Sequence, residues 1–162
     1  LDRMSSQAGQ TVGEMIRLVS WARIWSEVQE SLAERERVQW SGDVDLQKAW
    51  VVVPVAGFAQ AIRGIVQNGL DASPPGALVT VALRQVKDLW RLTVTDRGSG
   101  MSEDVLKRVS EPFFTTKPPG QGMGLGVFLA RGLVRRLGGE IHIESDRNRG
   151  TTVSIELPVA SP

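Results

Sequence analysis

The sequence ALVTVALRQVKDLWRLTVTDRGSGM, residues 77–101, decides the fold of this chain. Two segments in it, ALVTVALRQ and DLWRLTVTD, alternate apolar with small or polar residues, which is the period of a strand with one buried face. The polar turn between them, Val86-Lys87-Asp88, is short enough to join antiparallel neighbours. The stretch therefore predicts a hairpin whose second strand runs directly into the glycine-rich loop 96–101.

Helix patterns lie on both sides of this hairpin. Pro54 suits a first helical turn, apolar residues recur at helical spacing from Phe58 to Leu70, and SPPG at 73–76 ends the pattern. A helix is expected over about residues 12–34, either continuous or broken near Ser20, and Thr11 and Glu14 at its start have capping-box spacing. Two other helices are expected, one after Ser102 as N-cap and one from about 124 to 137.

Further strands are expected at RVQW, residues 37–40, and in a second hairpin formed by GEIHIESD and GTTVSIELP. Strands that gather in the second half, with helices between them, predict a two-layer sandwich with the helices on one sheet face. One domain is expected over residues 12–158, preceded by a linker at 1–11 and followed by a tail at 159–162.

Composition excludes several classes of function. The 162 residues are 41% hydrophobic, which fits one globular domain, and 19 basic residues balance 18 acidic ones, unlike the charge of a nucleic-acid binder. The absence of cysteine excludes disulfides and thiolate metal sites, and His142 alone cannot build a histidine metal cluster. No apolar run approaches the ~18 residues of a membrane span.

Three short features suggest ligand contacts, and each has an ordinary alternative. The glycines in GQGMGLG, residues 120–126, leave bare N–H groups for phosphate where a helix begins, although such a loop is equally often a flexible connection. Neither the P-loop nor the dinucleotide pattern is present. Asp96, with Gly98, Gly100 and Met101, can accept a hydrogen bond from adenine N6 and pack under the ring, but D-x-G-x-G is also a common turn.

Asn68 is the third feature. Asparagine is a mediocre helix former, so its place inside an apolar helix calls for a reason. Its amide oxygen suits Mg²⁺, which takes few protein ligands beside nucleotide phosphates. The alternative is an asparagine that simply faces solvent.

The features occur in the order Asn68, D-x-G-x-G, EPFFTTK and GMGLG. This order resembles the ATP-binding catalytic domain of two-component sensor histidine kinases, in the wider group of gyrase, Hsp90 and MutL ATPases. The resemblance covers residues 12–158, and within the family the sequence looks most like the RegB/PrrB redox-responsive branch. Its matches are Asn68 (N box), Asp96 to Gly100 (G1 box), Phe113-Phe114 (F box), Gly122 to Gly126 (G2 box) and Gly150-Thr151 (the closing Gly-Thr element).

The resemblance implies a Bergerat fold of the α+β class, with a mixed, mostly antiparallel sheet, helices on one face and a flexible ATP lid. It implies ATP and Mg²⁺ as ligands, with Asn68 on the metal. The implied ATP-binding residues are Asn68, Asp96, Gly98, Gly100, Met101, Lys117, Gly122, Gly124, Leu125, Gly126 and Thr151.

Some implied roles have equally simple alternatives. Lys117 would pair with the γ-phosphate or be a solvated lysine, and Phe113 and Phe114 would anchor the lid or pack in the core. Thr151 would hydrogen-bond near the Asp96 carboxylate or be an ordinary strand threonine.

Two positions depart from the family pattern. Gly64 stands where the kinases carry a second asparagine and the ATPases a glutamate that activates water, so the general base of hydrolysis is missing. Asp71 stands where many kinases place a basic phosphate contact. The missing general base at Gly64 favours a phosphotransferase over an ATPase. Gly64 and Asp71 together keep open the alternative of a regulatory module that binds nucleotide without transferring phosphate.

The resemblance implies transfer of the γ-phosphoryl group to a histidine on a separate dimerisation domain, and then to a response regulator. His142 alternates within a strand and is not expected to be the acceptor. The chain itself is expected to be a cytoplasmic monomer without nucleic-acid or membrane contact. Anchorage of its parent protein in the inner membrane is left open. A regulatory nucleotide-binding module and an anti-sigma-type serine kinase remain as alternatives.

Overall fold

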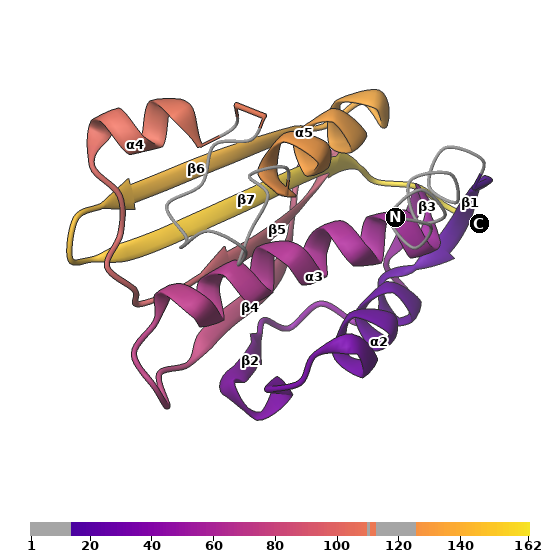
Figure 1. The fold of residues 1–162 in the computed structure, drawn as a ribbon. Helices are drawn as coiled ribbons and strands as arrows, with labels where there is room; N and C mark the ends of the chain where they lie inside the picture. Colours follow the sequence, from indigo (N-terminus) through magenta and orange to yellow (C-terminus); the bar gives the residue numbers. More distant parts are fainter. Residues whose placement is uncertain (1–13, 110, 113–125) are drawn as a thin grey trace, which may run out of the picture.

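The computed structural model describes residues 14–109, 111–112 and 126–162. They form two layers, with a sheet behind and helices α2, α3 and α5 in front of it (Figure 1). The main sheet has five strands in the order β2-β4-β5-β7-β6, and β1 pairs with β3 in a separate ribbon. The elements are β1 (Ile16–Ser20), α2 (Trp21–Ser31), η1 (Arg35–Arg37), β2 (Val38–Ser41), β3 (Trp50–Pro54), α3 (Val55–Ala72), β4 (Val79–Val86), β5 (Leu89–Thr95), α4 (Glu103–Arg108), α5 (Gly126–Arg136), β6 (Glu140–Asp146) and β7 (Gly150–Pro158).

The predicted hairpin is present at the centre of the sheet. Strands β4 and β5 pair antiparallel with Val86 opposite Leu89, and Lys87 in the turn has a φ of 57°. Strand β5 then pairs antiparallel with β7, and β7 with β6, whereas β2 and β4 run parallel. The predicted mixed, mostly antiparallel α+β sandwich is therefore confirmed.

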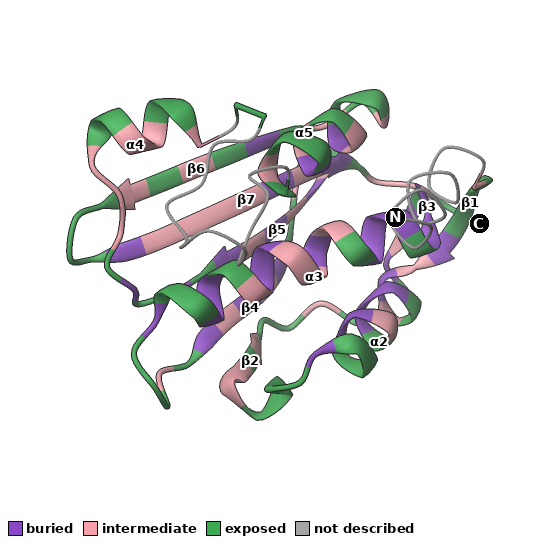
Figure 2. Ribbon diagram, in the orientation of Figure 1, coloured by how far each residue is buried: buried purple, intermediate pink, exposed green. Residues whose placement is uncertain are grey.

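The core lies between the helices and one face of the sheet, where buried positions alternate along the strands (Figure 2). Helix α3 presents the fully buried side chains of Phe58, Ile62 and Val66 to this core. Trp21, at the start of α2, packs edge-on against Phe58 and Trp90, with ring centroids 5.6 and 6.5 Å away. These aromatic contacts join the β1–α2 segment to the main sheet.

The predicted helix over residues 12–34 is wrong in its first part. Residues 16–20 form strand β1, and the helix begins only after Ser20, whose hydroxyl accepts a hydrogen bond from the Arg23 N–H. Strand β1 pairs antiparallel with β3, which the sequence analysis did not assign as a strand. An apolar run as short as that of β3 carries no periodicity that separates strand from helix.

Glu14 caps a different helix from the one its spacing predicted. Its two carboxylate oxygens accept the N–H groups of Ala56 and Gly57, at 2.7 and 2.9 Å, at the start of α3. Thr11, the other half of the expected capping box, lies outside the described residues. The carboxylate thus satisfies free N–H groups at the positive end of a helix far along the chain.

The remaining predicted elements are confirmed. Ser102 caps α4 by accepting the Val105 N–H, and α5 is followed by Gly138 with a φ of 83°. Strand β2 and the β6–β7 hairpin lie where they were expected. Within the described residues, no helix combines the length and the apolar character needed to cross a bilayer.

Candidate functional site

Three segments meet where β5 ends: the loop 96–101, the last turn of α3 and the turn between β6 and β7. Asp96 is the first residue of the loop and is 8% exposed. Its backbone continues the pairing with β7, because its N–H donates to the Thr151 carbonyl at 2.9 Å. The end of the sheet therefore fixes where this carboxylate lies.

The Asp96 carboxylate uses one oxygen within the fold. Oδ1 accepts the N–H groups of Gly98, at 2.8 Å, and Thr151, at 3.2 Å. Burial raises the pKa of Asp96, and these two hydrogen bonds oppose that shift without cancelling it. Among the described residues nothing donates to Oδ2, which faces α3 at Gly69, where an added Cβ would lie 3.6 Å from it. One acceptor of a buried carboxyl is thus left for a ligand.

Gly98 and Gly100 are required by close backbone approaches. A Cβ on Gly98 would lie 2.5 Å from the carbonyl oxygen of Ala72, in the last turn of α3. Gly100 has a φ of 68°, and a Cβ there would collide with the carbonyl of Asp146. The D-x-G-x-G loop is therefore packed between a helix end and a hairpin turn.

The β6–β7 turn holds the other side of the loop. The Asn148 N–H donates to the Ser99 carbonyl at 2.6 Å, and the Met101 N–H donates to Ser145 Oγ at 2.8 Å. Ser145 Oγ also lies 2.8 Å from Thr151 Oγ1. The expected side-chain bond from Thr151 toward Asp96 is thus replaced: its backbone N–H reaches the carboxylate, and its hydroxyl contacts Ser145.

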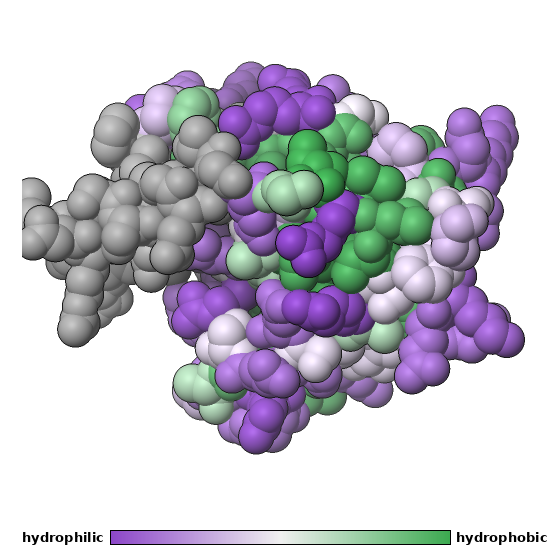
Figure 3. Space-filling view, turned by 90° about the vertical axis from the view of Figure 1, so that its right-hand side faces the viewer, coloured by the Kyte–Doolittle hydropathy of each residue, from purple (hydrophilic) through white to green (hydrophobic). Residues whose placement is uncertain are grey.

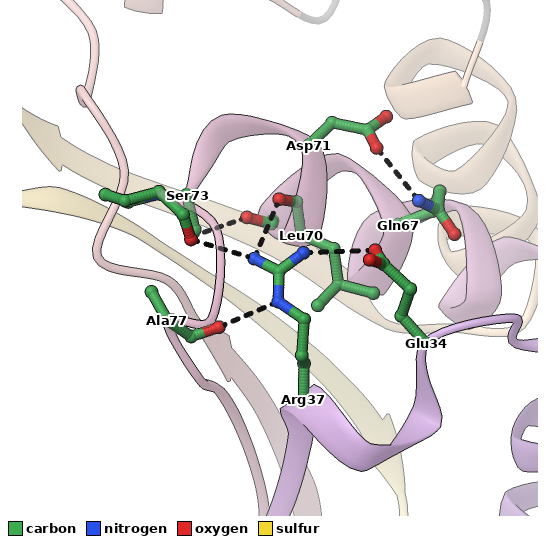
Figure 4. A network of polar contacts seen from close by, with 9 residues as sticks. Glu34, Arg37, Gln67, Leu70, Asp71, Ser73 and Ala77 are labelled. Carbon is green, nitrogen blue, oxygen red and sulfur yellow. Dashed lines mark hydrogen bonds and ion pairs between the residues drawn. The ribbon is translucent and has the colours of Figure 1, made fainter.

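Asn68 is exposed on α3 and directly precedes Gly69, the residue that faces Asp96. Asp71, one turn further on, accepts a hydrogen bond from Gln67 Nε2 at 2.8 Å (Figure 4). Helix α3 therefore carries Asn68, the predicted metal-side residue, directly before Gly69, which packs against the Asp96 side chain.

The structure brings together the residues predicted for one end of the nucleotide: Asp96, Gly98, Gly100, Met101 and Thr151. Gly126 is the first residue of α5 and is exposed. The other predicted residues lie outside the described part of the chain: Phe113, Phe114, Lys117, Gly122, Gly124 and Leu125. Their roles stay predictions.

Sequence reasoning missed Gly69 and Ser145. Gly69 had a signal, because a glycine inside a helix is costly and indicates close packing. Ser145 had none, since it is an ordinary polar residue in an alternating strand. His142 lies in a strand, as expected: its Nε2 is 2.8 Å from Glu156 Oε1 and its side chain is 58% exposed.

Residues 55–161 match the family model of histidine kinase-, DNA gyrase B- and HSP90-like ATPases. The chain belongs to this family. Sporulation kinase D of Bacillus subtilis is 39% identical over 102 residues, which are 63% of this chain and 20% of that protein. The chain therefore spans only a part of the curated relatives it matches.

Solved structures agree with this family membership. The mycobacterial sensor histidine kinase MprB superposes with a TM-score of 0.76 at 25% identity, over 91% of this chain and 100% of that one. Full-length ShkA in complex with AMPPNP shares the fold, with a TM-score of 0.75 at 19% identity over 94% of this chain and 33% of that one. This chain is the ATP-binding catalytic domain of a sensor histidine kinase.

We predict that Gly98→Ala destabilises this catalytic domain by about 1–3 kcal/mol, because the new methyl overpacks against the backbone of Ala72. The control is Gly64→Ala in helix α3, where, apart from the backbone of the helix itself, no described atom lies within 4 Å of the added Cβ. That control should stabilise the domain by about 0.5–1 kcal/mol. Urea unfolding measures both variants, and equal effects would contradict the packing assigned to Gly98.

Proposed function

We propose that this catalytic domain binds Mg²⁺-ATP and transfers the γ-phosphoryl group to a histidine on a separate dimerisation domain of its parent protein. The observation that carries the proposal is the buried Asp96 carboxyl, with Oδ1 saturated and Oδ2 without a donor among the described residues. An exocyclic amine such as adenine N6 is a donor of the right kind for Oδ2.

The rest of the loop suits a flat base. Gly98 and Gly100 keep side chains away from the loop backbone, and Met101 is half-buried with its N–H held by Ser145. Adenine specificity then comes from one fixed acceptor, because an analogue without the 6-amino group leaves Oδ2 buried and unpaired.

Asn68 suits a Mg²⁺ ion that takes most of its other ligands from the phosphates of the nucleotide. Its side chain is exposed on α3, beside the pocket wall at Gly69, and supplies one neutral oxygen of the kind that Mg²⁺ accepts. Within the described residues, no group of three or more histidine, cysteine, aspartate or glutamate side chains forms a metal site by itself. The fit is therefore to a metal that takes its other ligands from nucleotide and water, and such an ion would supply charge neutralisation at the phosphates.

Gly64 supports transfer over hydrolysis. It lies in the middle of α3, one turn before Asn68, and carries no side chain that could activate water. Phosphoryl transfer to a histidine needs mainly positioning and charge neutralisation from this domain, with the acceptor supplied from elsewhere. His142 is paired with Glu156 and lies in a strand of the sheet, which does not suit an acceptor.

The proposed partners are the dimerisation domain and then a response regulator, and the proposed compartment is the cytoplasm, where ATP is available. The domain is proposed to be a monomer over residues 12–158. The side that bears the β1–β3 ribbon shows a group of hydrophobic side chains near its centre (Figure 3). Exposed apolar residues there are Met15, Ile16, Leu18 and Val52, which suit contact with apolar helix surfaces of the dimerisation domain.

Asp96→Asn should move stability and affinity in opposite directions. The raised pKa of Asp96 means that the folded wild type loses stability as pH rises from the unfolded value through the folded one. Asparagine does not ionise and keeps an acceptor for the N–H groups of Gly98 and Thr151. The free energy of unfolding of the variant, minus that of wild type, should therefore increase from pH 4 to pH 7. Urea unfolding at both pH values measures this, and Asp43→Asn at an exposed site is the control.

The same variant should bind ATP about 1–3 kcal/mol more weakly, roughly five- to 150-fold in Kd, because an amide donor would face the adenine amine. Calorimetric titration at pH 7 gives this value. An unchanged ATP affinity would remove Asp96 from base recognition.

Asn68→Ala should weaken ATP binding in the presence of Mg²⁺ and leave metal-free binding nearly unchanged. The lost oxygen serves the metal, so only the Mg²⁺-dependent part of affinity depends on it. Titrations of ATP with Mg²⁺ and with a chelator measure the two parts. Gln60→Ala, another exposed amide on α3, is the control; equal losses in both titrations would indicate a packing defect.

Phosphorylation of the parent's dimerisation domain by γ-labelled ATP tests the proposal as a whole. Transfer of acid-labile label, abolished or strongly reduced by Asp96→Asn, is the expected result. Acid-stable label would indicate the serine-directed alternative. Nucleotide binding without label transfer would leave a regulatory module as the function.

A further inference from the structure

Helix α3 carries no charge of its own that complements its dipole. Its first turn has no acidic residue, its last turn has no basic residue, and its N-cap Pro54 offers no side-chain acceptor. Both charges come from other parts of the chain: Glu14 binds the N–H groups at the start, and Arg37 binds a carbonyl at the end. An anion at the N-terminus and a cation at the C-terminus are the favourable signs.

The Arg37 guanidinium holds three backbone carbonyls at the end of α3 (Figure 4). Nη2 donates to Leu70 O at 3.3 Å and to Pro74 O at 3.1 Å, and Nε donates to Ala77 O at 3.1 Å. Nη1 is paired with Glu34 at 3.0 Å, and the Arg37 side chain is only 13% exposed. A planar fork with five donors is needed to reach all of these acceptors at once, which a lysine cannot do.

The segment that Arg37 holds is the one that touches the Asp96 loop. Ala72 lies between Leu70 and Pro74, and its carbonyl approaches Gly98 so closely that no Cβ fits. Gly69, one residue before Leu70, faces the Asp96 carboxyl. A shift of the last turn of α3 is therefore a shift of the wall against which Asp96 and Gly98 are packed.

We propose that Arg37 is a positioning residue for base recognition: by clamping the end of α3 through Leu70, Pro74 and Ala77, it sets the distance between that helix and the Asp96 carboxyl. The inference rests on the proposed role of Asp96 toward the adenine amine. Arg37 does not touch the base; it acts through Ala72 and Gly69. Its loss should therefore reduce discrimination for the 6-amino group more than it reduces general nucleotide affinity.

The experiment compares Kd for ATP with Kd for purine riboside triphosphate, which lacks the 6-amino group. It uses the wild-type chain, Arg37→Met and Arg37→Lys. The Kd for purine riboside triphosphate divided by the Kd for ATP measures how well Asp96 is placed to bind the 6-amino group. A variant that only lowers stability leaves this ratio unchanged. Arg37→Met should lower the ratio roughly three- to tenfold, and Arg37→Lys, which keeps the charge without the fork, should fall between it and wild type.

Glu14→Gln is the matched control. It removes the complementary charge from the other end of the same 18-residue helix, about 27 Å from the clamp at 1.5 Å per residue. This variant should lower the melting temperature and leave the Kd ratio within about twofold of wild type. A second control, Arg23→Ala, removes an exposed arginine paired within α2 and should change neither quantity.

The outcomes distinguish the positioning role of Arg37 from the proposed role of Asp96 in binding the adenine amine. A wild-type ratio well above one, lowered by Arg37→Met and unchanged by Glu14→Gln, supports the positioning role. A wild-type ratio well above one that both Arg37 variants preserve overturns it and leaves Arg37 as a stabilising residue only. A wild-type ratio near one overturns the proposed role of Asp96 itself. If Arg37→Met does not fold, the ratio of Arg37→Lys decides.

Discussion

The close approach of α3 to the loop after β5 is the constraint on which the rest of the site depends. Gly98 meets the carbonyl of Ala72, and Gly69 meets the side chain of Asp96, so both segments lack side chains where they touch. The end of the helix and the loop that follows the strand can then lie in close contact. Asp96 therefore lies against Gly69, which directly follows Asn68, so the two residues of the proposed nucleotide site lie on segments that touch.

Burial of the Asp96 carboxyl lowers the stability of the folded state. A carboxyl buried at 8% exposure pays a desolvation cost that two backbone hydrogen bonds only partly offset, as the raised pKa shows. A core residue of similar size without charge would avoid this cost. The cost persists because Asp96 is held from both sides, by Gly98 within the loop and by Thr151 across the sheet. Such local cost is expected where a site must match a ligand.

Local patterns predicted most of the fold, and long-range contacts account for the failures. The hairpins β4–β5 and β6–β7 and the helices α3 and α5 follow from periodicity and turn residues that lie close together in sequence. Strand β1 was assigned to a helix because its pairing partner, β3, lies some thirty residues away and is itself a short apolar run. Glu14 likewise looked like a local cap, although its acceptor role serves α3.

The site shows the same division. Asp96, Gly98 and Gly100 could be named from sequence because the loop's spacing is local. The bonds from Ser145 to Met101 and from Arg37 to the carbonyls at the end of α3 join residues more than thirty positions apart, and no short motif predicts them. A short motif could not predict the contacts that hold the loop in place, since these come from α3, from β7 and from the β6–β7 turn.

These contacts fit the proposed function, in which the domain holds ATP until its acceptor arrives. The loop proposed to bind the base is held by contacts with the sheet, the helix and the hairpin turn, whereas the helix position proposed for a water-activating base is occupied by Gly64, which has no side chain. Under the proposed function, a nucleotide bound in this way would be well oriented but poorly hydrolysed, so its turnover would depend on a nucleophile from another domain. A firmly placed adenine and a missing general base are then consistent with each other, because the role proposed for this domain is to position ATP and not to activate the attacking group.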